Sequence, residues 1–199
     1  SLPTRRSSDL NSRYQQQLQQ LELQNDENRY EEQRLAQTTP ETAADRENRQ
    51  MLNRLRELAR RQSDLNQRIK ELQSELQAAQ NEADRREIQR RLKRLRDEQR
   101  EILRDSDELK SRMEQPENQE QMAEQQQQLE RAREQARKSS EALQEGMVSQ
   151  AAASGSRAER ELNELREEFR RRLSTRFDQQ MRDMKREAQE MDQRQAELS

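Results

Sequence analysis

Residues 51–76 read MLNRLRELARRQSDLNQRIKELQSEL, and residues 88–113 read IQRRLKRLRDEQREILRDSDELKSRM. In the first stretch, steps of alternating four and three residues mark a seam formed by Met51, Leu55, Leu58, Gln62, Leu65, Ile69, Leu72 and Leu76. The second stretch repeats these steps through Ile88, Leu92, Leu95, Gln99, Ile102, Ser106, Leu109 and Met113. Because a repeat of 3.5 residues keeps such side chains on one stripe of a helix, both stretches are typical of coiled coils.

The two seams are out of phase by two residues, which corresponds to about 200° around a helix. One continuous helix would therefore carry two apolar stripes on nearly opposite faces. A chain that reverses near residues 80–84 instead brings the two seams together layer by layer. Asn81 suits such a turn because Asn caps helices and adopts turn conformations, although no glycine is present there. The pattern favours an antiparallel hairpin over residues 39–115 and leaves the single long helix as the alternative.

The composition supports helices and excludes a thick globular core. Of the 199 residues, 40% are charged, 27% hydrophobic and 2% aromatic, whereas ordinary domains are about 45–50% apolar and about 25% charged. The net charge of −2 and the regular spacing of Leu and Ile argue against disorder. We therefore predict an all-α fold in which long helices form extended antiparallel coiled-coil hairpins.

The N-terminal region is weaker in pattern. Residues 1–10 resemble the translation of a common DNA-sequencing library adapter, so we exclude them from the fold reasoning; the alternative is a native disordered tail. Residues 11–38 are Gln-rich and predict a weakly anchored helix, because polar residues occupy its seam. Thr39 as a cap and Pro40 as the first helical residue predict the start of the first long helix.

A second hairpin is predicted over residues 116–199. Pro116 ends the preceding helix because proline lacks the backbone donor that a continuing helix requires. The turn falls near residues 146–149, where Gly146 can end one helix and Ser149 can cap the next. The last helix is longer than its partner, so its C-terminal part overhangs.

The overhang carries the candidate partner-helix surface: Leu173, Phe177, Met181, Met184 and Met191. These side chains need cover from the other hairpin, from a second copy or from sequence after residue 199. Methionine adapts to several partners. An ordinary coiled-coil core still explains the stripe more simply than a dedicated recognition groove.

No constellation of catalytic residues is found. The chain has no Cys and no His, which removes thiol chemistry, zinc–thiolate sites and the commonest general base. It has no Gly-rich phosphate loop, and no apolar run approaches the roughly 18–20 residues that span a bilayer. We expect no enzyme activity and no catalytic, cofactor-binding or metal-binding residues.

Two Arg-rich segments, residues 85–96 and 170–176, raise the possibility of nucleic-acid binding. Such binding needs basic charge concentrated on one face. Acidic residues lie close to both segments: residues 81–115 contain 11 basic and 10 acidic residues, and residues 147–199 contain 11 of each. Solvated helix faces that pair with themselves are the simpler interpretation, and nucleic-acid binding is not expected.

From about residue 51 onward the chain resembles a family of large bacterial membrane-anchored coiled-coil proteins of unknown function. The resemblance rests on three segments: LRELARRQSDLN (55–66), RRLKRLRDEQ (90–99) and MEQPEN (113–118). It implies a coil within a longer protein, associated with the bacterial envelope through an anchor outside these residues. It supplies no catalytic residues.

These observations predict a non-enzymatic structural or interaction segment of a larger bacterial protein, acting as a spacer or assembly module. Its expected partners are a second copy, in a homo-oligomer, or another helical protein. The alternative is a nucleic-acid-associated coiled coil of the chromosome-organising type, which a steep salt-dependent affinity for duplex DNA would favour.

Overall fold

The computed structural model describes residues 15–17, 19–20, 29 and 42–198. It divides into two units, residues 1–43 and 44–199. The described positions before residue 30 are helical and exposed. The predicted tail at 1–10, most of the Gln-rich segment at 11–38, and the helix start at Thr39 and Pro40 lie outside the described residues. The described part contains helices and no strand, which confirms the all-α prediction.

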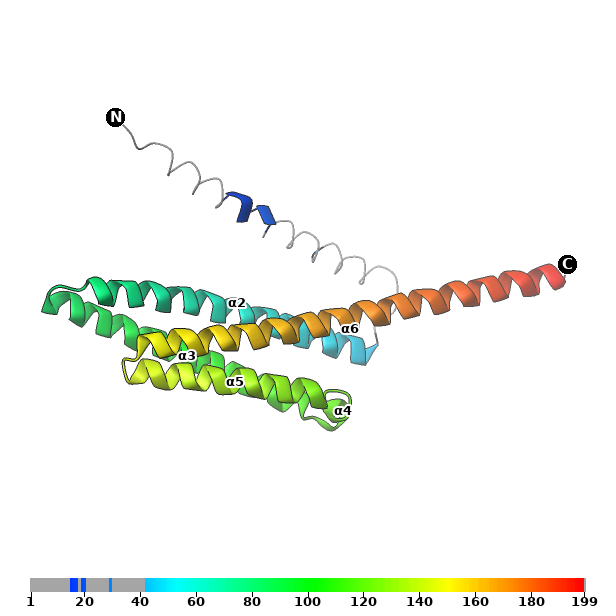
Figure 1. The fold of residues 1–199 in the computed structure, drawn as a ribbon. Coiled ribbons are helices and arrows are strands. Elements are labelled where there is room, and N and C mark those ends of the chain that lie inside the picture. Colours follow the sequence, from blue (N-terminus) through cyan, green and yellow to red (C-terminus); the bar gives the residue numbers. More distant parts are fainter. Residues whose placement is uncertain (1–14, 18, 21–28, 30–41, 199) are drawn as a thin grey trace, which may run out of the picture. The chain divides into compact units, whose positions relative to one another are not determined.

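The first long helix, α2 (Ala43–Ala78), is followed after a three-residue turn by α3 (Glu82–Met113). Asn81 is the N-cap of α3, and its side-chain oxygen accepts a hydrogen bond of 2.8 Å from the Asp84 backbone N–H. This bond satisfies one of the donors left free in the first turn of a helix. The helices lie side by side and run in opposite directions (Figure 1), so the predicted hairpin is confirmed over the single long helix.

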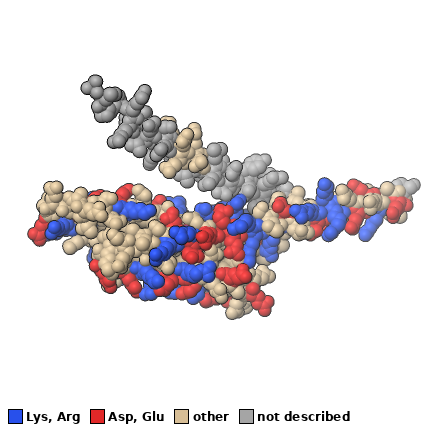
Figure 2. Space-filling model, in the orientation of Figure 1, with Lys and Arg blue, Asp and Glu red and all other residues tan. Residues whose placement is uncertain are grey.

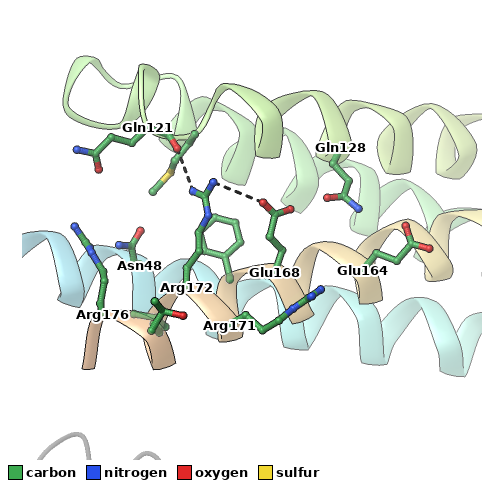
Figure 3. Close-up of a pocket in the computed structure, with 12 residues that line it drawn as sticks. Asn48, Gln121, Gln128, Glu164, Glu168, Arg171, Arg172 and Arg176 are labelled. Carbon is green, nitrogen blue, oxygen red and sulfur yellow. Dashed lines mark hydrogen bonds and ion pairs between the residues drawn. The ribbon is translucent and has the colours of Figure 1, made fainter. Parts of the chain in front are cut away.

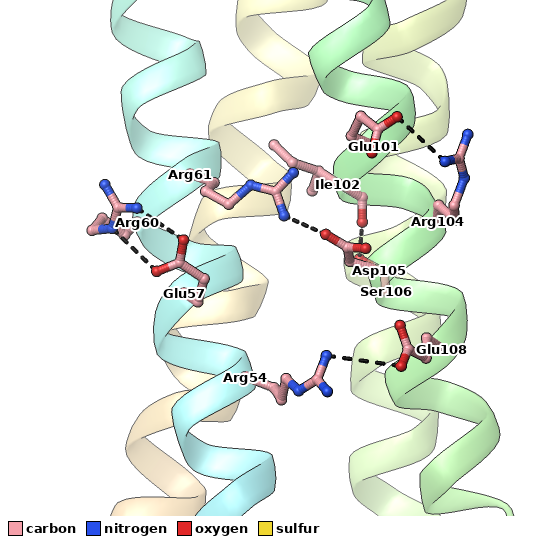
Figure 4. Close-up of polar contacts among 10 residues, drawn as sticks. All are labelled: Arg54, Glu57, Arg60, Arg61, Glu101, Ile102, Arg104, Asp105, Ser106 and Glu108. Atoms are coloured by element: carbon pink, nitrogen blue, oxygen red, sulfur yellow. Dashed lines mark hydrogen bonds and ion pairs between the residues drawn. The ribbon is translucent and has the colours of Figure 1, made fainter.

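Ion pairs between α2 and α3 follow the register of the hairpin. They join residues that lie at nearly equal distances from the turn: Arg54–Glu108, Arg61–Asp105, Arg68–Glu98 and Glu75–Arg91. The first two are visible in Figure 4. The same view shows how the polar seam residue Ser106 is accommodated, since its hydroxyl donates a hydrogen bond of 2.8 Å to the carbonyl oxygen of Ile102 in its own helix.

A second hairpin follows a short connection. The one-turn helix α4 (Pro116–Gln119) has its proline in the first turn, and α5 (Ala123–Gln144) leads to α6 (Val148–Glu197). Gly146 has a φ of 75° between α5 and α6, a conformation that glycine adopts without strain.

One predicted cap in this turn is wrong. The N-cap of α6 is Met147, whose side chain makes no capping bond, because α6 begins before Ser149. The Ser149 hydroxyl instead accepts a hydrogen bond of 2.8 Å from the Gln73 side chain of α2. Ser149 therefore links two helices and does not cap one.

The two hairpins share one core. α5 packs on both α3 and α6, and α6 contacts α2 through hydrogen bonds such as Asn66 to the Gly155 carbonyl oxygen. Each buried Leu or Ile contributes about 1.5–3 kcal/mol when fully covered. Fully buried side chains come from all four long helices: Leu55, Ile69, Ile102, Leu129, Leu162 and Leu165 are among them.

Candidate docking surface on α6

The C-terminal part of α6 runs on past the other helices of its unit (Figure 1). Phe169 is the last fully covered apolar side chain of α6, with 1% of its surface exposed. Near this point Arg176 and Gln180 of α6 donate hydrogen bonds of 3.1 and 3.2 Å to the Asp45 carboxylate of α2. Residues 181–198 are exposed or half-buried throughout.

The five predicted surface residues divide into two groups. Leu173 is half-buried and packs against the shared core, and Phe177 is also half-buried. Met181, Met184 and Met191 are 39%, 46% and 61% exposed. The bundle therefore covers the near end of the predicted surface, and the three methionines remain accessible to a partner.

These side chains continue the apolar stripe that α6 turns toward its own bundle. From Phe169 the steps are three fours, through Leu173, Phe177 and Met181. A three–four pattern then resumes through Met184, Ala188 and Met191. A step of four residues advances about 40° around a helix, so three such steps in a row move the stripe to one side before the three–four pattern keeps it in place. The apolar stripe of the bundle thus extends into the exposed part of α6, shifted around the helix axis.

Charged residues flank this exposed stripe. Arg186 pairs with Asp183 at 3.1 Å along the helix. In contrast, Lys185, Glu187, Asp192 and Arg194 form no ion pair within 4.0 Å with another residue that the structure describes. These four charges are available to a partner.

An open groove lies where α6 leaves the bundle (Figure 3). It has a volume of about 770 Å³, and its walls include Asn48 of α2, Met122 beside α5, and Phe169 of α6. Arg172 donates a hydrogen bond of 3.1 Å to the Gln121 carbonyl oxygen and pairs with Glu168 at 3.6 Å. The groove thus mixes both signs of charge.

The described residues offer neither a metal-ion cluster nor a helix that could cross a membrane. Those residues contain no group of three or more acidic side chains placed to hold a metal ion. Across the same ranges, no helix combines the length and apolar character needed to cross a bilayer.

The Arg-rich segments are largely paired with neighbouring acids. Glu87 alone lies 3.4 Å from Arg90, 3.6 Å from Arg91 and 3.6 Å from Arg94. On the face shown in Figure 2, basic and acidic side chains are intermingled wherever charged residues gather. In the second segment, Arg170 pairs with Glu167 at 3.1 Å.

Sequence reasoning missed a buried polar cluster in the middle of the bundle. The amides of Gln62 and Gln99 exchange hydrogen bonds of 3.0 and 2.7 Å, and Gln62 also donates to Asn66 at 2.9 Å. Asn66 in turn donates to the Gly155 carbonyl oxygen and to the Glu159 carboxylate, both at 2.8 Å. A signal was present: Leu52, Ala59 and Asn66 form a second seven-residue repeat beside the main seam of α2.

The chain matches no protein-family model, no curated protein and no solved structure. The exposed end of α6 is the feature of the described residues that folding alone explains least.

Proposed function

We propose that this chain is a non-enzymatic structural and interaction module of a larger bacterial protein. The four long helices, with α6 up to residue 180, form a base. Residues 181–198 of α6 form an arm that acts as a spacer and offers a surface to a helical partner. The observation that carries the proposal is the apolar stripe of α6, which continues past Phe169 into exposed Met181, Met184 and Met191.

The local sequence favours a stiff arm. No Gly or Pro follows Gly155 in α6, so nothing in the later part of the helix introduces the usual causes of a kink. At 1.5 Å per residue, residues 181–197 reach about 25 Å from the base. Exposed methionine side chains suit contacts with a partner helix. A bacterial envelope setting rests on the resemblance of residues 51–199 alone.

The spacer property can be tested by distance measurements between spin labels. The chain lacks cysteine, so Ser63→Cys on α2 and Gln189→Cys on the arm introduce the only attachment points. Labelled chains are diluted into unlabelled protein to remove intermolecular signals. We expect a narrow distance distribution, with a width similar to that of the control pair Ser63→Cys and Ser174→Cys within the base. A broad distribution confined to the Gln189 pair would reject the spacer.

A further inference from the structure

We propose that the arm of α6 pairs with the arm of a second copy of this chain in antiparallel orientation. The pairing spans residues 181–198, with a two-fold axis near residues 189 and 190. This inference rests on the proposed function, because it names the partner of the same surface. The evidence is the continuity of the apolar stripe with the bundle core and the pattern of unpaired charges beside it.

The apolar layers come first. After the three steps of four, the exposed stripe resumes a coiled-coil repeat, with Met181, Ala188 and Gln195 at one seam position and Met184, Met191 and Leu198 at the other. In antiparallel pairs the two kinds of position face each other. With the two-fold axis near residues 189 and 190, Met181 faces Leu198 of the second copy, Ala188 faces Met191, and Met184 faces Gln195. Each layer occurs twice by symmetry.

The flanking charges then complement one another. Lys185 and Asp192 occupy equivalent positions on one side of the stripe, and Glu187 and Arg194 occupy equivalent positions on the other. Antiparallel pairing brings Lys185 against Asp192 of the second copy and Glu187 against Arg194. Because each contact is repeated by the axis, four opposite-charge contacts form. Such contacts chiefly determine orientation and register.

Other arrangements of the same two arms bring like charges together. A parallel pair in register would place Glu187 against Asp192 of the second copy, twice. The next antiparallel register, with its axis near residue 186, would place Lys185 against its own copy and Asp178 against Asp192. Repulsion of this kind selects against wrong pairings. Charge therefore distinguishes the proposed register from its nearest competitors.

In the proposed register the paired residues begin beside the base of each copy. Met181, which faces Leu198 of the second copy, directly follows Gln180, which contacts Asp45. The paired region therefore ends where each bundle begins. Because the seam is short, we expect a dimer that forms and dissociates with concentration rather than a permanent one.

Sedimentation equilibrium of the full chain over a concentration series, at low salt, tests the inference. We expect the average mass to rise toward twice the chain mass. Lys185→Asp and Asp192→Lys should each weaken the dimer by about tenfold or more, since attraction becomes repulsion at two symmetric contacts. The double variant Lys185→Asp/Asp192→Lys reverses both partners and should restore wild-type affinity. Arg160→Glu, an exposed charge change on the base of α6, is the matched control and should leave the mass curve unchanged.

The outcomes separate the alternatives. Strengthening by Asp192→Lys alone would indicate the parallel pair, because Glu187 would then face a lysine, and would overturn the antiparallel one. If neither single variant changes the affinity of the dimer, the interface lies elsewhere on the chain. A wild-type chain that stays monomeric throughout the series would overturn the dimer. The spin-label distances test the spacer without requiring association, so the two proposals fail independently. Circular dichroism of each variant confirms that the helices are retained.

Discussion

At the scale of single residues, Gly155 is a position where the two hairpins approach closely. A Cβ atom added there would overlap Asn66 Oδ1 and lie 3.2 Å from Asn66 Cγ. Alanine normally stabilises a helix interior by about 1 kcal/mol relative to glycine. Here we expect Gly155→Ala to lower the free energy of unfolding by about 1–3 kcal/mol, because overpacking displaces Asn66 from its hydrogen bonds.

Chemical denaturation of four chains measures this: wild type, Gly155→Ala, Asn66→Ala, and the double variant. Removing the Asn66 amide opens space for the new methyl group, so the double variant should be more stable than the sum of the two single effects predicts. If the two losses in the free energy of unfolding simply add, then the glycine at position 155 is not needed to make room for the Asn66 side chain. Ala153→Gly, at an exposed position of the same helix, is the control for helix propensity.

The reciprocal amide pair of Gln62 and Gln99 makes a second residue-scale prediction. Both side chains are fully buried, so each amide supplies the hydrogen bonds that water would otherwise make with the other. Gln62→Leu leaves the Gln99 amide without its partner, and we expect a loss of about 1–3 kcal/mol in the free energy of unfolding. Gln62→Leu/Gln99→Leu replaces both polar groups and should recover part of that loss, because Asn66 Oδ1 still lacks the hydrogen bond that Gln62 donated. Urea titrations decide between this outcome and independent losses at the two sites.

At the scale of helices, an ion pair ties the beginning of α2 to the end of α3. Arg112 donates hydrogen bonds of 2.6 and 2.8 Å to the two oxygens of the Glu47 carboxylate. These bonds hold the pKa of Glu47 below its ordinary value of 4.5, against the opposing effect of burial. The stabilisation is therefore complete above the unfolded-state pKa and is lost as the pH falls through the lower, folded-state pKa.

We expect Glu47→Gln to lower the free energy of unfolding by less than about 1 kcal/mol near pH 7, because the pair is partly exposed. The difference from wild type should shrink as the pH is taken well below 4.5, where the wild-type carboxyl is also neutral. Urea titrations at several pH values measure both differences. A gap between the two chains that is constant with pH would show that Glu47 acts through packing and not through its charge.

The helices also show what the sequence could and could not predict. The seams from Met51 and from Ile88 predicted the antiparallel hairpin because each repeat faces one neighbour. They could not show that α2 also buries Leu52, Ala59 and Asn66, since that second stripe has meaning only once α6 is known to lie beside it. The exposed surface followed from the unequal lengths of the last two helices, but how far the base covers Leu173 and Phe177 depends on where α2 begins.

The ends of elements were predicted least well. Leu76 belongs to the predicted seam, yet it is 41% exposed. Gln73 already contacts Ser149 near the first turn of α6, so the tip of the first hairpin extends past the start of the second. A repeat in the sequence predicts which face of the helix a residue occupies. How much of its side chain is buried depends on how the neighbouring helices are offset along their axes.

At the scale of the whole molecule, charge pairing favours the proposed module over a nucleic-acid-associated coil. The chain has a net charge of −2. In the Arg-rich segment of α3, Arg91 pairs both with Glu75 of α2 and with Glu87 of its own helix. Binding to duplex DNA requires arginines that can release counterions from phosphates. Arginines already paired with carboxylates, beside further acids that repel the duplex, contribute little to that process.

We therefore expect no measurable affinity of the wild-type chain for a fluorescently labelled DNA duplex in anisotropy titrations at low salt. Glu75→Gln/Glu87→Gln removes the acids that face Arg91 and Arg94 without adding a cation. If pairing is what suppresses binding, this variant should bind the duplex more tightly than wild type, and its affinity should fall as salt is raised. Steep salt-dependent binding by the wild-type chain itself would favour the chromosome-organising alternative, because it would mean that these arginines exchange their carboxylate partners for phosphates at little cost.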